Sequence, residues 1–466
     1  MRSKFYVSLA MLCCIAGGLL FLIFDTVLPT TILSPLEAGT TIQAPLSPQQ
    51  AEYELYLPLI VDKLPPLTAK FGIQLQPEIR QYVSSTETVA ADLAMAHEMG
   101  SRWNRVSVPW NEIETAPGVY DWQVMDAVIT QTVAAGFEPL GMVWGAPEWA
   151  AEQSCGPIRD IAAFENFLEA LFTRYRTDVD AWEFTNEPDR RDAHPSWGPV
   201  VGCWGLEAEA YADQLGVFYR SARQFVPSAL VVSGGLAYDG WENHERSFWE
   251  NILAAGAGQY FDVANIHYYP INALDFPTMA HKVDEIRATM KRYGVDHKPI
   301  WVTETGMWTN DIIGGDAEKQ RDFIVKEQTR GFAAGVDNIF WFDPRVRIVP
   351  SNFVERFLFT EDHEPLTGYA TYQFYANKVS GMIPVQGSVS GLPTDIEAYR
   401  FYKGSSELFI VWSNTVTQTL TFTSDIDALV SDRDGTATTT VVSQNGEVMF
   451  EVGPLPRYVE FISDEN

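Results

Sequence analysis

The chain has 466 residues, enough for one large domain and a smaller one, and its hydrophobic content of 46% with a mean hydropathy of −0.09 excludes a disordered or wholly membrane-embedded protein. Lys and Arg total 32 against 61 Asp and Glu, which gives a formal net charge of −29. So acidic a surface repels phosphate backbones, and we expect no nucleic acid among its partners.

The N-terminus resembles a membrane-directed segment. Arg2 and Lys4 precede an apolar run of about twenty residues, Phe5 to Phe24, which is long enough to cross a bilayer. The basic residues predict that residues 1–25 anchor the protein in the membrane, with the rest of the chain outside the cell. A cleaved signal peptide is the alternative, and it would make the protein secreted, with no membrane partner.

Residues 26–66 are rich in Pro, Thr and Ser and predict a spacer. From residue 67 to residue 379, short β-like runs alternate with stretches of helical period. Strands are predicted at 71–76, 103–109, 139–145, 181–186, 230–234, 261–269, 299–304 and 338–343, and helices at 89–99, 122–135, 162–175, 207–225, 280–292 and 318–334.

An alternation repeated about eight times predicts an α/β fold, namely a (β/α)8 TIM barrel. A doubly wound open sheet is the alternative. No Gly-x-Gly-x-x-Gly fingerprint follows the first strand, so a dinucleotide role has no support, and we expect no cofactor.

Residues 380–466 have a different character. Short alternating runs are separated by turn signals such as Asp434-Gly435 and Asn445-Gly446, which predicts an all-β module resembling a β-sandwich. Sugar-binding surfaces favour Trp, but of the 14 Trp residues only Trp412 falls in this region. A structural appendage is therefore favoured over a carbohydrate-binding module.

Two glutamates stand at the ends of predicted strands. Glu187 lies in the Asn-Glu-Pro triplet at 186–188, and Glu304 lies in the Thr-Glu-Thr-Gly run at 303–306. The carboxyl ends of barrel strands share one rim, so both side chains are expected there. Cleavage of a glycosidic bond requires two such carboxyl groups, whereas two unrelated solvated strand ends are the plain alternative.

Other polar and aromatic residues fall at equivalent strand ends. Taken singly, each has a structural explanation as an ion pair, a core histidine or barrel filling, but their convergence on one rim indicates a binding site. These residues are Arg105, Trp144, His267, Tyr269 and Trp341.

Two loops add further candidates. Trp149 lies in an aromatic-rich loop after the third strand and could line extended subsites of a cleft or close a pocket for removal of terminal sugars. Cys155 and Cys203 follow two consecutive strands, so they could form a disulfide in an exported protein, although two free thiols are equally compatible with the spacing.

Together these motifs resemble clan A of the glycoside hydrolases. Closer features, among them Arg102-Trp103-Asn104-Arg105, Ile113-Glu114, Ser233-Gly234-Gly235 and Trp182-Glu183, are similar to family 39 and related bacterial exopolysaccharide endoglycosidases. The resemblance spans about residues 71–375 and implies a retaining hydrolase of β-glycosidic bonds in extracellular polysaccharide or oligosaccharide.

The resemblance also implies roles for individual residues. Glu187 would be the acid/base, with a raised pKa beside anionic Glu304, and Glu304 would be the nucleophile, with Arg105 and Tyr269 supporting it. Asn186 would bind the sugar 2-hydroxyl.

In the same resemblance, Trp341 would offer an apolar face to the sugar, and His267 would orient its polar neighbours. No metal is expected, because metal-binding His and Cys spacings are missing from the sequence. A non-catalytic surface glycan-binding protein on a barrel scaffold and a transglycosylase are the alternatives.

Overall fold

The computed structural model describes residues 41–43, 70–75, 86–196, 198–238, 243–270, 276–309, 316–345 and 357–461. The predicted anchor at 1–25 lies outside this range, so it stays a prediction. Among the helices of the described residues, none combines the length and the apolar character that crossing a bilayer requires.

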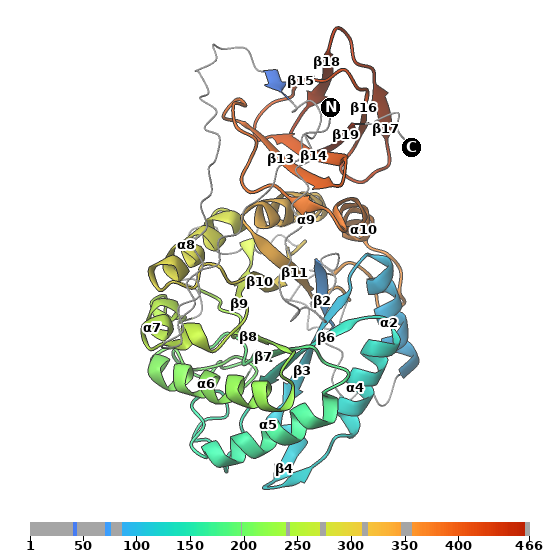
Figure 1. Ribbon diagram of the computed structural model, residues 1–466. Helices are drawn as coiled ribbons and strands as arrows, with labels where there is room; N and C mark the ends of the chain where they lie inside the picture. The colour runs from blue at the N-terminus through green and yellow to red at the C-terminus, as the bar shows by residue number, and fades with distance from the viewer. Residues whose placement is uncertain are drawn as a thin grey trace, which may run out of the picture. The chain divides into compact units, whose positions relative to one another are not determined.

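The centre of the structure is an eight-stranded parallel sheet with the order β8-β7-β6-β3-β2-β11-β10-β9 (Figure 1). Parallel bridges Val232↔Val263 and Leu236↔Ile266 connect its two ends, so the sheet is nearly closed. The predicted barrel is confirmed. Its strands are β2 (Phe71–Gln74), β3 (Trp103–Pro109), β6 (Glu138–Trp144), β7 (Ala181–Phe184), β8 (Leu230–Val232), β9 (Ala264–Tyr268), β10 (Ile300–Thr305) and β11 (Val336–Phe342).

Helices follow the strands and cover the outside of the barrel (Figure 1). Three of them begin where the sequence supplies a capping side chain, because Asp160, Thr278 and Asp316 each accept a hydrogen bond from the backbone N–H three residues later. The helices are α2 (Thr86–Glu98), α4 (Gln123–Ala134), α5 (Ile161–Tyr175), α6 (Ala208–Phe225), α7 (Phe248–Ala254), α8 (Met279–Arg292), α9 (Ala317–Ala333) and α10 (Thr367–Val379).

Two short insertions also belong to this region. After β3, the helix α3 (Trp110–Ile113) leads into a hairpin of β4 (Glu114–Ala116) and β5 (Val119–Tyr120), and the 3-10 helix η1 (Ala257–Gln259) follows α7.

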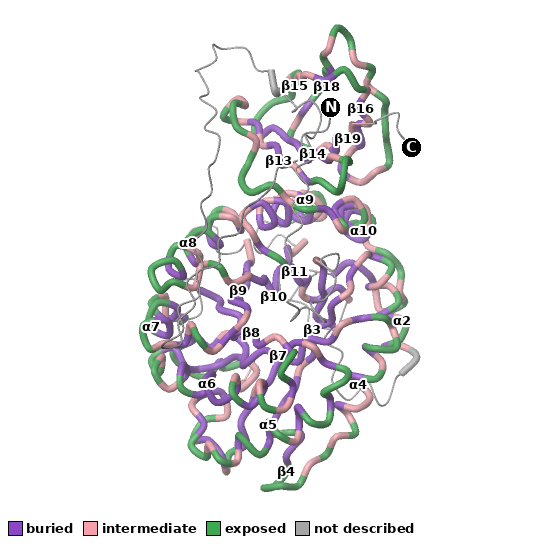
Figure 2. The backbone as a smooth tube through the Cα atoms, in the orientation of Figure 1, coloured by how far each residue is buried: buried purple, intermediate pink, exposed green. Residues whose placement is uncertain are grey.

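The barrel interior is filled by side chains. Its inner apolar cluster combines residues from seven strand regions: Trp103, Leu140, Ala181, Val232, Val263, Trp301 and Phe340. Successive strand residues point to opposite faces, so residues two positions further along each strand also face the axis and form the layer above. Figure 2 shows these strands as almost continuously buried. The site is built on this layer.

The C-terminal region is all-β, as predicted. One sheet has the order β12-β13-β14-β19-β16-β17, and a second has the order β1-β15-β18. A separate apolar cluster that includes Phe409, Phe422 and Val459 draws on both sheets. The strands of this region are β12 (Ile383–Pro384), β13 (Ile396–Lys403), β14 (Ser406–Ser413), β15 (Gln418–Thr423), β16 (Ala428–Ser431), β17 (Thr438–Val441), β18 (Glu447–Val452) and β19 (Arg457–Phe461). Strand β1 (Thr41–Gln43) comes from the predicted spacer and pairs with β15 in parallel.

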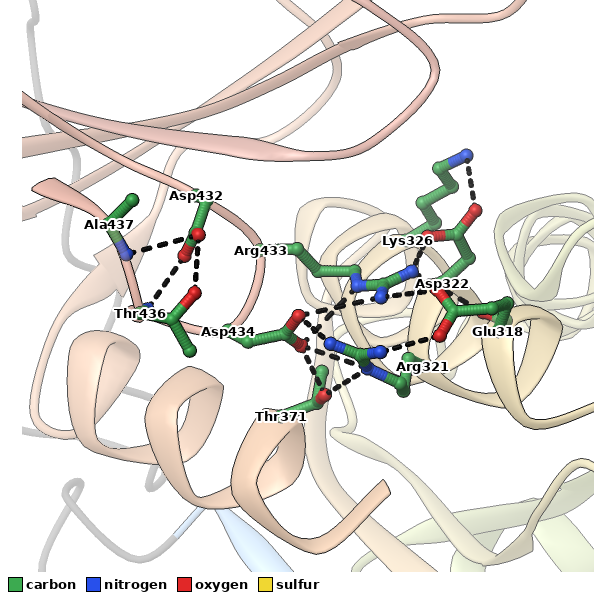
Figure 3. A network of polar contacts seen from close by, with 10 residues as sticks. All are labelled: Glu318, Arg321, Asp322, Lys326, Thr371, Asp432, Arg433, Asp434, Thr436 and Ala437. Carbon is green, nitrogen blue, oxygen red and sulfur yellow. Dashed lines mark hydrogen bonds and ion pairs between the residues drawn. The ribbon is translucent and has the colours of Figure 1, made fainter. Parts of the chain in front are cut away.

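Charged side chains connect this module to helices α9 and α10 (Figure 3). Arg433 donates to Asp322 and Glu318 at 2.7 Å each, and Arg321 pairs with Asp434. Trp412 is completely buried, with the guanidinium of Arg330 lying 5.3 Å from its ring. Its ring is therefore enclosed within the protein rather than presented to a sugar at the surface.

Candidate active site

Arg105 is the centre of a buried hydrogen-bond network at the carboxyl ends of the strands. Its guanidinium donates to both oxygens of Glu183 at 2.7 Å, to Oε1 of Glu304 at 2.6 Å and to Oδ1 of Asn186 at 2.8 Å, as well as to Gln74. Arg105 and Glu183 are completely buried. A planar group with several fixed donors can hold these four partners in one arrangement.

Glu304 receives hydrogen bonds on both carboxyl oxygens. Tyr269 donates its hydroxyl to Oε2 at 2.8 Å, while Arg105 donates to Oε1. Strand alternation alone would place Glu304 on the outer face with Val302, but the register of β10 shifts between Val302 and Thr305. This irregularity turns the carboxyl group toward the barrel axis, which is a known use of strand bulges next to active sites.

Glu187 and His267 form a second pair. Nδ1 of His267 lies 2.9 Å from Oε1 of Glu187, and Nε2 lies 3.2 Å from the hydroxyl of Thr303. Ligand atoms of Glu187, His267 and Glu304 all lie within 4.8 Å of one another. The two carboxyl groups therefore face each other across a gap of the size that a sugar carbon and a glycosidic oxygen can bridge.

The pKa of Glu187 is lowered, although the sequence led us to expect a raised value. Burial by itself raises this pKa, but the hydrogen bond and charge of His267 outweigh it, with smaller contributions from His244 and Arg105. The expectation considered only the repulsion by Glu304 and was wrong. In this arrangement His267 therefore favours the ionised form of Glu187.

The backbone around Glu187 is held in an unusual conformation. Thr185 and Glu187 have φ angles of 59° and 41°, in the left-handed region that residues with a Cβ rarely adopt. The N–H of Glu187 donates to the carbonyl of Gly235 at 3.0 Å. A Cβ on Gly235 would lie 2.2 Å from Nε2 of His267, so only glycine permits this close approach.

Most of the predicted site residues come together. Arg105, Asn186, His267 and Tyr269 join the two glutamates in the network described above. Trp144 lies at the end of β6 on the face that points to the axis, and its indole N–H donates to Ser107 of β3. It forms part of the rim beside this network.

The prediction that Trp341 contacts the sugar is wrong. It is completely buried and packs edge-on against Phe323 of α9 and Tyr372 of α10, with ring centroids 6.1 and 6.0 Å away. Phe340 belongs to the cluster inside the barrel, so alternation directs Trp341 outward and Phe342 inward. Phe342, which is partly exposed, occupies the rim position that Trp341 was expected to fill.

Trp149 packs edge-on against Trp110, with ring centroids 6.0 Å apart, and is partly buried against the outer core. Its proposed subsite role stays a prediction. Cys155 and Cys203 form a disulfide that joins the loop after β6 to the loop after β7.

Several residues of the site were not predicted from the sequence. Glu183 and Gln74 bind Arg105, and the signal for them was a polar residue at an inward position of an otherwise apolar strand. Trp308 follows β10, and its ring centroid lies 5.3 Å from that of Tyr269. It is partly exposed, so it can contact both Tyr269 and a bound sugar.

A metal ion is one chemical use of such a cluster. Glu187, His267 and Glu304 are close enough to serve as ligands. However, both oxygens of Glu304 already accept hydrogen bonds from Arg105 and Tyr269, and the cationic guanidinium opposes a second cation beside it. The donor set fits proton transfer and nucleophilic attack better than metal binding.

Comparisons with known proteins place this chain in a family and a fold. Residues 110–372 match the sequence model of the family described as the glycosyl hydrolase catalytic core. The aryl-phospho-beta-D-glucosidase BglA of Bacillus subtilis is 32% identical over 162 residues, which are 31% of this chain and 32% of that protein. The chain therefore matches about a third of the length of this curated relative.

Solved structures share the fold. A family 39 glycoside hydrolase from Bacteroides cellulosilyticus WH2 aligns with a TM-score of 0.65 and 18% identity, over 85% of this chain and 81% of that one. A family 39 beta-xylosidase from Caulobacter crescentus aligns with a TM-score of 0.59 and 14% identity, over 85% and 97%. A family 30 endoxylanase from Clostridium papyrosolvens C71 gives 0.58 and 14%, over 85% and 96%.

Proposed function

Because this chain belongs to the glycosyl hydrolase catalytic core family, we propose that it hydrolyses β-glycosidic bonds with retention of the anomeric configuration. The observation that carries the proposal is the approach of Glu187 and Glu304, whose ligand oxygens lie within 4.8 Å. Retaining enzymes hold the two carboxyl groups about 5–5.5 Å apart, whereas inverting enzymes need about 6.5–9.5 Å to admit a water molecule. The short separation favours direct attack by a carboxylate.

Glu304 is the nucleophile in this proposal. Its carboxylate attacks the anomeric carbon while Glu187 donates a proton to the departing oxygen, which leaves a covalent glycosyl-enzyme. Arg105 and Tyr269 direct the oxygens of Glu304 and place positive charge and a hydroxyl donor beside them. In the second step, Glu187 accepts a proton from water, and that water displaces the sugar from Glu304.

His267 supports Glu187 in both steps. Nδ1 of His267 lies 2.9 Å from Oε1 of Glu187, so the imidazole orients the carboxyl group that exchanges the proton. Asn186 is positioned to bind the 2-hydroxyl, since Arg105 holds its carbonyl oxygen and thereby orients its amide nitrogen. Trp308 and Phe342 supply the apolar walls expected around a sugar ring.

We further propose that the substrate is an extracellular polysaccharide or oligosaccharide with uncharged sugars, and that the protein is anchored to the cell membrane or secreted. The basic and apolar N-terminal sequence supports this location, and the Cys155–Cys203 disulfide fits an oxidising compartment. The net charge of −29 disfavours anionic chains. Mass spectrometry of the native N-terminus distinguishes an uncleaved anchor from a removed signal peptide.

The experiment is a turnover screen on aryl β-glycosides and β-linked polysaccharides, with products sized by mass in water enriched in heavy oxygen. We expect new reducing ends that carry the heavy oxygen and, by NMR, an initial product of β configuration. Glu304→Ala should abolish turnover while melting as a folded protein. Full activity of that variant, or an initial α product, would refute the proposal; excess acceptor sugar reveals any transglycosylation.

A further inference from the structure

A second segment lies along the backbone that carries Glu187. The N–H of Gly202 donates to the carbonyl of Asn186 at 2.7 Å, and the N–H of Trp204 donates to the carbonyl of Pro188 at 2.9 Å. The N–H of Gly205 continues the pattern with the carbonyl of Arg190 at 2.7 Å. Residues 202–205, which we call the return segment, therefore bind the backbone of residues 186–190 on both sides of Glu187 in the sequence.

The disulfide fixes this return segment to the barrel. Cys203 lies in its middle, is bonded to Cys155 and also donates its backbone N–H to the carbonyl of Cys155 at 2.9 Å. The neighbouring Ser154 is tied to the end of β6, because its carbonyl accepts the N–H of Ala146 at 2.9 Å and its hydroxyl donates back to the carbonyl of Ala146. The disulfide thus holds the return segment, and with it the backbone around Glu187, at a fixed place relative to β6.

This restraint helps to keep the backbone at Thr185 and Glu187 in its unusual conformation. The positive φ angles of Thr185 and Glu187 are disfavoured for residues with a Cβ and persist only where the surroundings enforce them. Relaxation of either angle would swing the Glu187 carboxyl group away from His267 and Glu304. Glu304 is carried by β10 on another part of the barrel, so the same relaxation would leave it in place.

We propose that the Cys155–Cys203 disulfide is a positioning element for acid/base catalysis by Glu187. This inference rests on the proposed function and adds that activity depends on the redox state of these cysteines. With the disulfide reduced, the return segment loosens, Glu187 loses its alignment with the departing oxygen, and the nucleophile stays competent.

Leaving-group chemistry separates this role from general destabilisation. The 2,4-dinitrophenolate group leaves its β-glycoside without being protonated, whereas the phenol group of a phenyl β-glycoside needs a proton from the acid Glu187. The test compares the rates of the native protein on both substrates before and after treatment with dithiothreitol. Dithiothreitol reduces the disulfide to two thiols and is itself oxidised to its cyclic disulfide. Thiol labelling and mass confirm reduction. Because small misplacements of a catalytic group are costly, kcat for the phenyl glycoside should fall about 10- to 100-fold.

The 2,4-dinitrophenyl substrate should lose less than about threefold in its glycosylation rate. Its steady-state kcat and KM should both fall, because Glu187 also activates water in the second step and the glycosyl-enzyme would accumulate. The double variant Cys155→Ser/Cys203→Ser should reproduce this pattern. Gly202→Ala tests the return segment without touching a cysteine, since its Cβ would lie 2.9 Å from Cα of Pro188 and 3.0 Å from the carbonyl of Asn186. It should show the same dependence on the leaving group.

Gly118→Ala is the matched control. Gly118 has a positive φ of 74°, lies in the β4–β5 turn and has open space around its Cβ position, so the variant strains the backbone away from the site. It should retain the wild-type ratio between the two substrates. If a serine variant fails to fold, reduction of the native protein still gives the answer.

Equal losses of the glycosylation rate on both substrates, or full activity after verified reduction, would overturn the positioning role. Failure of the proposed function looks different: Glu187→Ala would then show no preference for the better leaving group, in oxidised and reduced protein alike.

Discussion

Replacing Arg105 by Met should lower the free energy of unfolding by about 3–5 kcal/mol, the usual cost of removing one partner of a buried ion pair. The structure places most of that cost on Glu183, which is completely buried and would keep the backbone N–H of Gly235, at 3.1 Å, as its remaining donor in the described network. Glu304 is 9% exposed and retains Tyr269, so it contributes less.

A matched surface pair tests whether burial is the reason. Arg174 binds Asp126 with the same two-pronged geometry, with Nε at 2.8 Å and a terminal nitrogen at 2.5 Å, but both side chains are more than 40% exposed. Arg174→Met should therefore cost only about 0–1 kcal/mol.

Adding Glu183→Gln to Arg105→Met removes the stranded charge and should recover about 1–3 kcal/mol. The assay is urea denaturation at pH 7, in which the midpoint and slope are measured for each variant. Activity on a phenyl β-glycoside should fall about 100- to 1000-fold in Arg105→Met, because the charge beside the proposed nucleophile is lost. The reasoning fails if Arg105→Met is no less stable than Arg174→Met.

Three further perturbations have defined outcomes. Because the pKa of Glu187 is lowered in the folded protein, its ionised carboxylate stabilises the fold above the usual carboxyl pKa near 4.3, and this stabilisation is lost as the pH falls. The difference in unfolding free energy between wild type and His267→Ala should therefore shrink between pH 5 and about pH 2.5 in urea titrations. Trp341→Ala should cost about 3–5 kcal/mol of stability, whereas Phe342→Ala should chiefly raise KM; the reverse pattern would restore Trp341 to the site. Asp434→Asn, which weakens the pairing of α9 with the module, should lower unfolding free energy by about 1–2 kcal/mol, and a change below about 0.3 kcal/mol would contradict that role.

The fold and the shared rim could be predicted from the sequence, because one simple rule governs each of them. Alternating periods predicted the barrel, and the rule that strand ends share a rim brought Glu187, Glu304, Arg105, His267 and Tyr269 together although they are far apart in the chain. These conclusions needed only the positions of strand ends, which turn residues such as proline and glycine mark in the sequence.

Which side chains of a strand point to the barrel axis could be determined only from the tertiary structure. The run Ile339-Phe340-Trp341-Phe342 is apolar on both faces, as buried parallel strands are, so its pattern contains no information about which face meets the barrel axis. Glu304 reaches the site only through a register shift, and Glu187 only through left-handed backbone angles.

Long-range contacts decided the remaining features. The pKa of Glu187 depends on His267, which is 80 residues away in sequence, and the disulfide depends on two loops that only the closed barrel brings together. The amino-acid sequence by itself predicted the barrel and most of the polar residues that gather on its rim. Packing of the closed barrel decided their orientation and charge state, because both depend on neighbours that no local pattern specifies.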